Sequence, residues 1–74
     1  MTNDEALKAL DELVDLPAGT LTGAEKLEDV EGWNSMAMIG VIALADEEGV
    51  TLSPRQIAGC TTIGDVLALL KATG

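Results

Sequence analysis

Two capping boxes in the 74-residue chain constrain its fold more than any other local feature. In this pattern a Ser or Thr side chain caps the third residue of a helix, whose Glu or Gln side chain bonds back to the cap. Thr2 with Glu5 and Ser53 with Gln56 both match it, and Pro54 stands at the first helical position, which suits proline. The boxes predict that one helix begins after Thr2 and that a short one begins after Ser53 and ends near residue 59.

Two further helix starts are marked by single cap residues. Asn34 is a good N-cap for a helix that begins at Ser35 and runs to residue 48, where Gly49 suits the left-handed position that commonly closes a helix. Thr62 can cap a last helix, and Asp65 then lies near the positive end of the helix dipole. The chain therefore contains signals for three main helices and one short one.

Apolar side chains in the first and last helices recur at the spacing that places them on one face. In the first helix the predicted inner residues are Ala6, Leu7, Leu10, Leu13 and Val14. Its predicted polar face comprises Asp4, Glu5, Lys8, Asp11 and Glu12. In the last helix the predicted inner residues are Val66, Leu67, Leu69 and Leu70. We expect Pro17 and Gly19 to stop the first helix.

The second predicted helix is apolar nearly all round over its first ten residues. Such a helix is expected to be central and contacted on several sides. Gly40 lies in its interior, where glycine costs about 1 kcal/mol relative to alanine. Of Met36 and Met38, one is expected to lie in the core and the other on the surface.

Residues 15–34 form an unusually long connection for so small a chain. We expect Leu21, Leu27 and Val30 to pin it to the core, and residues 24–29 to form a helical turn. Residues 50–52 are short and extended, with no partner strand visible in the sequence. The predicted fold is an all-α, small four-helix bundle with a long first loop, in a single domain spanning residues 1–74.

The chain is strongly acidic, since four basic residues against thirteen acidic ones give a net charge of −9. Phosphate backbones and anionic lipid surfaces would repel it, which argues against nucleic-acid and membrane partners. A field of one sign favours steering toward basic patches on protein partners, although it can also serve solubility alone. No apolar run reaches the roughly 20 residues that span a bilayer, and no signal segment opens the chain. We expect a cytoplasmic monomer.

The residue types present exclude several kinds of site. The chain has no histidine and one cysteine, Cys60, so it forms neither an internal disulfide nor a plausible zinc site. Cys60 stands among apolar residues and is expected to be a buried structural thiol. A serine hydrolase needs a base beside its nucleophile, and the loop acids Glu28, Asp29 and Glu31 would be poor bases for a hydroxyl. We therefore expect no catalytic residue and no metal.

The most informative stretch is Gly32-Trp33-Asn34-Ser35-Met36, at the head of the second predicted helix. It resembles the Asp-Ser-Leu signature of the acyl carrier protein family, in the Gly-Trp-Asp-Ser-Leu form common in freestanding members. The resemblance covers essentially the whole chain. The other similar segments are residues 38–48, 49–54 and 62–66, which match the family's second helix, second loop and last helix start. Gly32 is expected to let a bulky enzyme approach the backbone closely.

The resemblance implies that Ser35 carries a covalent 4′-phosphopantetheine arm, attached by a phosphopantetheinyl transferase from coenzyme A. The thiol of that arm would hold acyl groups as thioesters for acyl-transferring, condensing or modifying enzymes. The flanking residues expected to aid recognition are Trp33, Asn34, Met36 and Met38. The residues alone agree, because a serine at a helix start projects outward, where a phosphodiester would meet free amides and the positive dipole end. Trp33 either anchors the loop on the bundle or contacts partners.

The sequence departs from the family's pattern at several places, among them Met36 in place of leucine and the absence of the phenylalanine that normally follows Glu48. Asn34 replaces the usual aspartate, which keeps the helix cap but removes a negative charge that family members offer to the transferase and its magnesium. Residues 37–45 lack the acidic side chains found in carriers of fatty-acid synthesis, so part of the docking surface is expected to be apolar. We expect dedicated partner enzymes with basic and apolar docking surfaces, in a specialised fatty-acid or polyketide-type pathway. Two alternatives remain, an unmodified helical interaction adaptor and an aminoacyl or peptidyl carrier.

Overall fold

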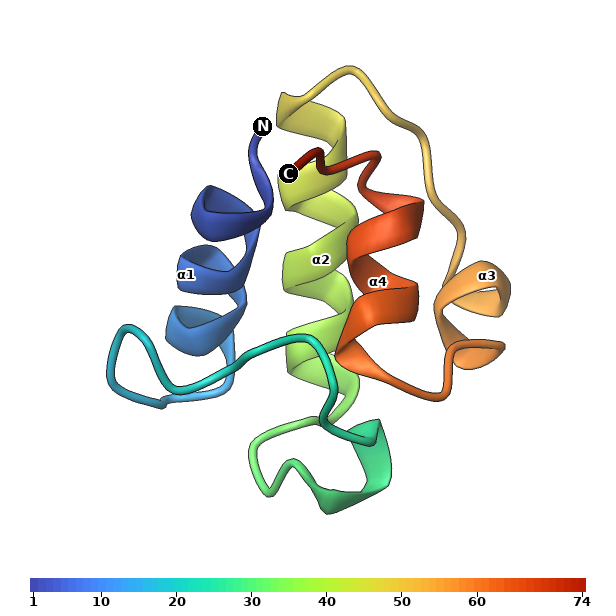
Figure 1. The fold of residues 1–74 in the computed structure, drawn as a ribbon. Helices are drawn as coiled ribbons and strands as arrows, with labels where there is room; N and C mark the ends of the chain where they lie inside the picture. The colour runs from blue at the N-terminus through green and yellow to red at the C-terminus, as the bar shows by residue number, and fades with distance from the viewer.

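The computed structural model describes residues 1–74, which form four α-helices and one 3-10 turn (Figure 1). The elements in chain order are α1 (Asn3–Leu13), η1 (Leu27–Asp29), α2 (Ser35–Glu47), α3 (Pro54–Ala58) and α4 (Ile63–Leu69). No strand is present, and residues 50–52 connect α2 to α3 without pairing. The expected all-α bundle is confirmed. No helix combines the length and the apolar character needed to cross a bilayer.

All four helices begin at the caps that the sequence predicts. The Thr2 hydroxyl accepts a hydrogen bond from the Glu5 backbone N–H at 3.1 Å, and the Glu5 carboxylate accepts one from the Thr2 N–H at 2.9 Å. Ser53 and Thr62 form equivalent reciprocal boxes at α3 and α4. These bonds satisfy amides that have no partner within the helix.

The end of α1 differs from the prediction, because Pro17 and Gly19 do not stop the helix. The helix already ends at Leu13, with Val14 as its C-cap, and Asp15 adopts a left-handed conformation with φ of 64°. A single left-handed residue reverses the chain direction before the proline is reached.

Asp11 is not on the polar face of α1, where its spacing places it, but is buried with 1% of its surface exposed. Its two carboxylate oxygens accept hydrogen bonds from the backbone N–H groups of Gly19 and Leu21, each at 3.0 Å. The connection after α1 folds back over this side chain. Asp11 therefore fixes the first half of the long loop to the bundle.

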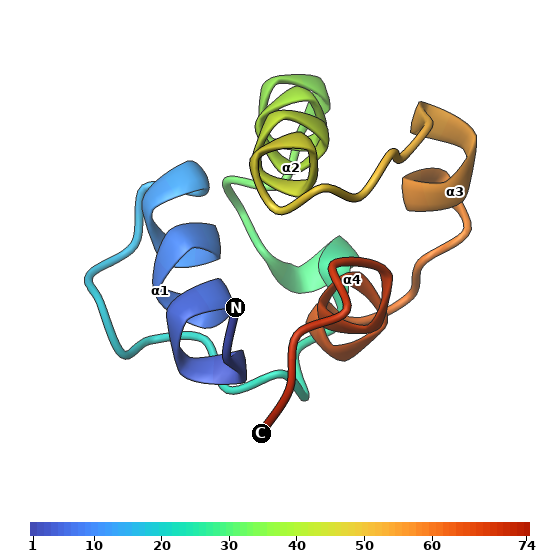
Figure 2. The ribbon, with the colours of Figure 1, turned by 90° about the horizontal axis from the view of Figure 1, so that it is seen from above.

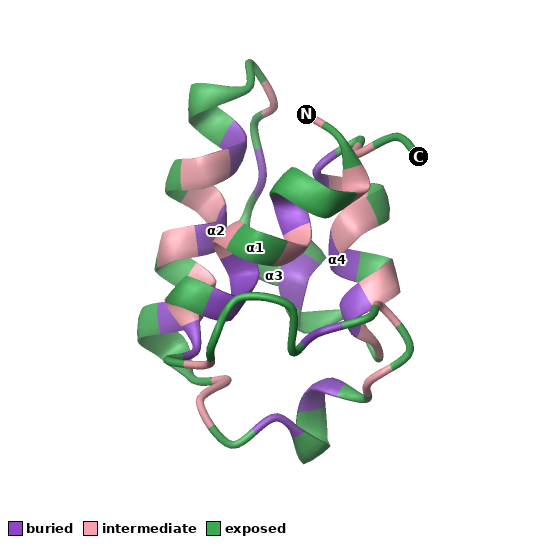
Figure 3. Ribbon diagram, turned by 60° about the vertical axis from the view of Figure 1, so that its left-hand side comes forward, coloured by how far each residue is buried: buried purple, intermediate pink, exposed green.

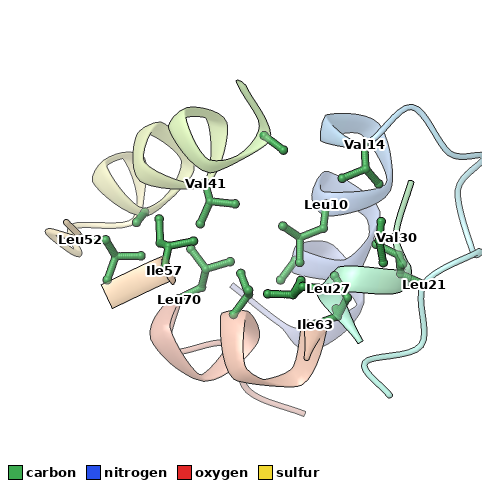
Figure 4. Packing of buried hydrophobic residues seen from close by; sticks show 14 residues of the cluster. Leu10, Val14, Leu21, Leu27, Val30, Val41, Leu52, Ile57, Ile63 and Leu70 are labelled. Carbon is green, nitrogen blue, oxygen red and sulfur yellow. The ribbon is translucent and has the colours of Figure 1, made fainter. Parts of the chain in front are cut away.

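The core is aliphatic and draws on all four helices and on the long connection (Figures 3 and 4). The predicted anchors Leu21, Leu27 and Val30 are all buried in it, which confirms their assignment. Figure 4 shows their side chains beside those of Leu10 and Ile63. The helical turn expected over residues 24–29 is present as the shorter η1.

Backbone hydrogen bonds hold the long connection against the start of α4. The N–H of Leu27 donates to the Thr61 carbonyl at 2.9 Å, and the N–H of Ile63 donates to the Glu25 carbonyl at 2.9 Å. The N–H of Gly64 donates to the Gly23 carbonyl at 2.8 Å. The connection is thus an ordered part of the bundle, and it leads the chain directly to the start of α2.

Helix α2 is contacted by α1 and by α3, which confirms the expectation of a central helix, and its outer face is left open to solvent. Ala37, Val41 and Ala45, spaced one turn apart, face the core. On the outer face, Met36 is 76% exposed and Ile39 is 62% exposed. Seen from above, α2 runs between α1 and α3 (Figure 2).

Candidate functional site

Ser35 is the first residue of α2, and its side chain is exposed. The cap in front of it is made by Asn34, whose side-chain oxygen accepts a hydrogen bond from the Ala37 N–H at 3.0 Å. Because Asn34 caps the helix, the Ser35 hydroxyl is not needed as a cap, and no protein group bonds to it. The structure therefore presents a free hydroxyl at the head of a 13-residue helix.

The backbone around Ser35 suits a phosphodiester. The Met38 N–H donates to the Asn34 carbonyl at 3.0 Å, and the Ala37 N–H is taken by the cap. The N–H groups of Ser35 and Met36 have no partner in the protein. Free amides at a helix N-terminus, with the positive end of the dipole behind them, stabilise an attached anion.

No group in the structure can activate Ser35 as a nucleophile. The chain has no histidine, and none of the exposed loop acids Glu28, Asp29 and Glu31 bonds to the hydroxyl. A serine nucleophile requires a base within hydrogen-bond reach. The structure thus places no base beside the Ser35 hydroxyl.

The approach to Ser35 is fixed by Gly32 and Trp33. A Cβ on Gly32 would lie 2.2 Å from the carbonyl oxygen of Val14, so glycine is required for the loop to pack on the end of α1. This internal contact explains Gly32 without any approaching enzyme. The Trp33 side chain is half-buried against the core, and the backbone N–H of Trp33 donates to the Val30 carbonyl at 3.0 Å. The structure thus favours the anchoring role of Trp33.

The two methionines after Ser35 divide as predicted, because Met38 packs against the core while Met36 faces solvent. Ile39, which was not among the predicted site residues, is exposed one turn after Ser35. It lines an open groove of about 250 Å³ between α2 and residues 50–52, together with Ile42, Val50 and Leu52. Its place four residues after Ser35 in an apolar helix is the signal that could have identified it.

Cys60 is half-buried rather than fully buried as expected. Burial raises the pKa of its thiol, and the negative charge of Asp65 raises it further. Its sulfur contacts the Gln56 carbonyl at 3.7 Å. A thiol with a raised pKa is a weak nucleophile, which is consistent with the expected structural role.

The site is thus a free serine hydroxyl at the start of a helix, on a small acidic bundle. Comparison with known proteins shows the family to which such a bundle belongs. The family model described as phosphopantetheine attachment site matches residues 5–70. The chain is also 30% identical over 69 residues to the acyl carrier protein MbtL of Mycolicibacterium paratuberculosis, an alignment that covers 92% of this chain and 78% of that protein. No solved structure matched this chain.

The chain belongs to the acyl carrier protein family. Domains of this family carry covalently attached 4′-phosphopantetheine and are generally not catalytic themselves. The free hydroxyl and the two unpaired amides described above fit such a group.

Proposed function

We propose that Ser35 is the residue to which 4′-phosphopantetheine is attached, and that the chain carries acyl groups as thioesters on that arm. The observation that carries the proposal is the exposed Ser35 hydroxyl, left without a protein partner at the start of α2. Ser53, the other serine of the chain, serves as the N-cap of α3 and accepts a hydrogen bond from Gln56. Ser35 is thus the serine whose oxygen is free to react.

Loading requires a base that accepts the serine proton, and the transferase must supply that base and assist the departure of the leaving group. The Ser35 oxygen attacks the phosphorus atom of coenzyme A that bears the pantetheine, and the Ser35 proton passes to a base of the transferase. The bond between that phosphorus and the oxygen of the nucleotide breaks, and adenosine 3′,5′-bisphosphate leaves. The chain supplies the exposed oxygen and the free N–H groups of Ser35 and Met36. When bound, the group supplies a thiol for thioester formation. The carrier itself acts as a substrate.

The outer face of α2 supports the proposal of dedicated partner enzymes. Met36 and Ile39 are the most exposed large apolar side chains of the molecule, and both lie within one turn of Ser35. The acids Asp46 and Glu47 follow on the same helix, and both are exposed. A partner that fits this face has an apolar depression with basic residues to one side. Such a partner is consistent with a specialised fatty-acid or polyketide-type pathway.

Loading is tested by intact mass after incubation with coenzyme A and a broad-specificity phosphopantetheinyl transferase. We expect the wild type and Ser35→Ala to differ by one phosphopantetheine, and Ser53→Ala to gain the group as the wild type does. Failure of the wild type to gain mass with several transferases would instead favour the unmodified adaptor.

The role of Asn34 is tested by Asn34→Asp, which keeps a good helix cap and restores a carboxylate. We expect faster loading by a generic transferase with an unchanged melting temperature. Equal loading rates would show that this transferase does not use the charge.

The specialised pathway is tested with the loaded protein and the general enzymes of fatty-acid synthesis. We expect acyl transfer to and from this carrier to be slower than with a standard fatty-acid carrier. Equal rates would overturn the specialised assignment while leaving Ser35 loading intact. Loading with an aminoacyl group by an adenylating enzyme would favour the aminoacyl alternative.

A further inference from the structure

The chain holds its sulfur atoms in three methionines and one cysteine, and these differ in their access to solvent. Met1, Met38 and Cys60 are half-buried and pack against the core. The side chain of Met1 is only 9% exposed, and its ammonium is paired with Glu48. Met36, in contrast, is 76% exposed. A water-soluble reagent that attacks sulfur therefore meets Met36 first.

Met36 stands directly after Ser35 in the first turn of α2, where the signature of the acyl carrier protein family has leucine. Leucine has no atom that a mild oxidant attacks, whereas methionine carries a thioether. The start of α2 lies at the end of the bundle opposite the two chain termini, and so it is far from Met1 (Figure 1). The departure from leucine thus puts the most accessible thioether of the molecule beside the candidate attachment residue.

A peroxide can oxidise the Met36 thioether without any catalytic group of the chain. A lone pair of the sulfur attacks one oxygen of hydrogen peroxide, and the O–O bond breaks. The transferred oxygen gives its proton to the departing oxygen, which leaves as water. The sulfur is oxidised and the peroxide is reduced. The product, methionine sulfoxide, is polar and chiral where the thioether was apolar and flexible.

The Cys60 thiol is a poor competitor for the same oxidant, because peroxides react with the thiolate form of cysteine. Burial raises the pKa of this thiol, and the negative charge of Asp65 raises it further, so the thiolate is scarce at neutral pH. The sulfur also lies against the Gln56 carbonyl, at 3.7 Å. Both the exposure and the chemistry of the sulfur atoms therefore direct oxidation to Met36.

We propose that Met36 is a peroxide-sensitive site, and that its oxidation to the sulfoxide slows the attachment of phosphopantetheine to Ser35. The second half rests on the proposed function. A transferase that reaches the Ser35 oxygen must cover the neighbouring side chain, and a sulfoxide oxygen covered without a hydrogen-bond partner opposes that contact. Because Met36 does not pack against the core, the fold tolerates the change. Methionine sulfoxide reductases reverse the oxidation.

The first measurement locates the oxidation. The full 74-residue chain is treated with limiting hydrogen peroxide, and the added oxygen is placed by fragmentation mass spectrometry. We expect Met36 to be oxidised before Met1, Met38 and Cys60, and the melting temperature to stay the same while Met36 alone is oxidised. Oxidation of Met36 no faster than that of Met38 would overturn the proposal.

The second measurement follows loading by a broad-specificity phosphopantetheinyl transferase after the peroxide has been removed. Each protein is compared with its own untreated sample, so that variants with different starting rates can be used. We expect treatment to slow loading of the wild type by about tenfold, the effect of one covered polar group without a partner. Treatment with the reductases for both sulfoxide epimers should restore the rate.

Two variants assign the effect to one sulfur atom. In Met36→Leu the treated and untreated rates should agree, because leucine is not oxidised. Cys60→Ser should be slowed by peroxide as the wild type is, which excludes the thiol. A loss of loading in Met36→Leu equal to that of the wild type would overturn the proposal, and so would a rate that the reductases do not restore.

Oxidation and loading are measured separately, so the two proposals can fail separately. Selective oxidation of Met36 with an unchanged loading rate would overturn the effect on loading and leave the proposed function intact. An untreated wild type that gains no phosphopantetheine would overturn the proposed function, and with it the effect of oxidation on loading. The fragments would still show in that case whether Met36 is the peroxide-sensitive residue.

Discussion

Asp11 and Glu25 are carboxylates that organise the loop leading to Ser35. Asp11 is the one charged residue in the buried set, and it receives two backbone N–H groups from the loop after α1. Glu25 closes a tight turn, in which its side chain accepts hydrogen bonds from the N–H groups of Thr22 and Gly23. Both use negative charge locally, by satisfying amides that the loop would otherwise leave unpaired.

Asp11→Ala is expected to destabilise the fold by about 1–3 kcal/mol, because it leaves buried backbone N–H groups without an acceptor. That is a large part of the roughly 4–11 kcal/mol expected for a chain of this length. Urea unfolding would measure it. The neighbouring exposed carboxylate provides the control, since Glu12→Ala should change stability by no more than about 0.5 kcal/mol. Equal effects of the two substitutions would contradict the role of Asp11 in fixing the loop to the bundle.

Glu25 should titrate abnormally. Hydrogen bonds from its own backbone N–H and from that of Thr22 lower the pKa of its carboxyl from 4.5 to about 2. A lowered folded-state pKa means that the stability due to this carboxylate is complete above pH 4.5 and is lost as the pH falls toward 2. A side-chain carboxyl NMR titration should give a midpoint near 2 in the folded protein and an ordinary one in urea. A folded-state midpoint near 4.5 would rule out the turn geometry.

At the scale of whole elements, the helix starts were predictable and the contacts between elements were not. Asn34, Thr62 and the two capping boxes act within four residues, so their signals are complete in the local sequence. The burial of Asp11 depends on a loop that returns eight to ten residues later, which helical spacing does not report. The position of Ser35 was predictable because its cap, its helix and its family motif coincide.

The contact of Gly32, where the loop meets the end of α1, was likewise not predictable from the sequence. The Cα hydrogen that a Cβ would replace points at the Val14 carbonyl, a contact that only the folded chain reveals. Gly32→Ala should therefore destabilise the protein by about 1–3 kcal/mol, through overpacking against rigid backbone. It should also shift the Trp33 fluorescence, because the displaced loop carries that side chain. Thermal unfolding and emission spectra would measure both effects.

Gly59→Ala is the matched control for this glycine. Gly59 has φ of −79°, and the nearest atom to an added Cβ is 3.5 Å away. We expect no loss and a gain of up to about 1 kcal/mol, because alanine restricts the unfolded chain. If Gly32→Ala were equally harmless, the packing of the loop on α1 would be disproved.

For the molecule as a whole, charge repulsion opposes the fold. The chain has thirteen acidic residues and four basic ones. One ion pair is formed, between the Met1 ammonium and the Glu48 carboxylate at 3.0 Å. The remaining carboxylates repel one another through solvent, and salt screens that repulsion over about 10 Å at 0.1 M. This repulsion therefore makes the fold sensitive to ionic strength.

Added salt should raise the melting temperature by several degrees between low and moderate ionic strength, since about 1 kcal/mol corresponds to about 4–8 °C for a domain of this size. Divalent cations should act in the same direction at lower concentration. Differential scanning calorimetry across a series of sodium chloride concentrations would measure the change. A melting temperature that does not respond to salt would mean that repulsion is negligible.

The central claim concerns the location of the arm on the folded molecule. The most direct measurement is fragmentation mass spectrometry of the loaded protein, with the added group localised along the chain. We predict that the fragments place it on Ser35, the free hydroxyl at the head of α2. Localisation to Ser53 or to any other residue would contradict the account.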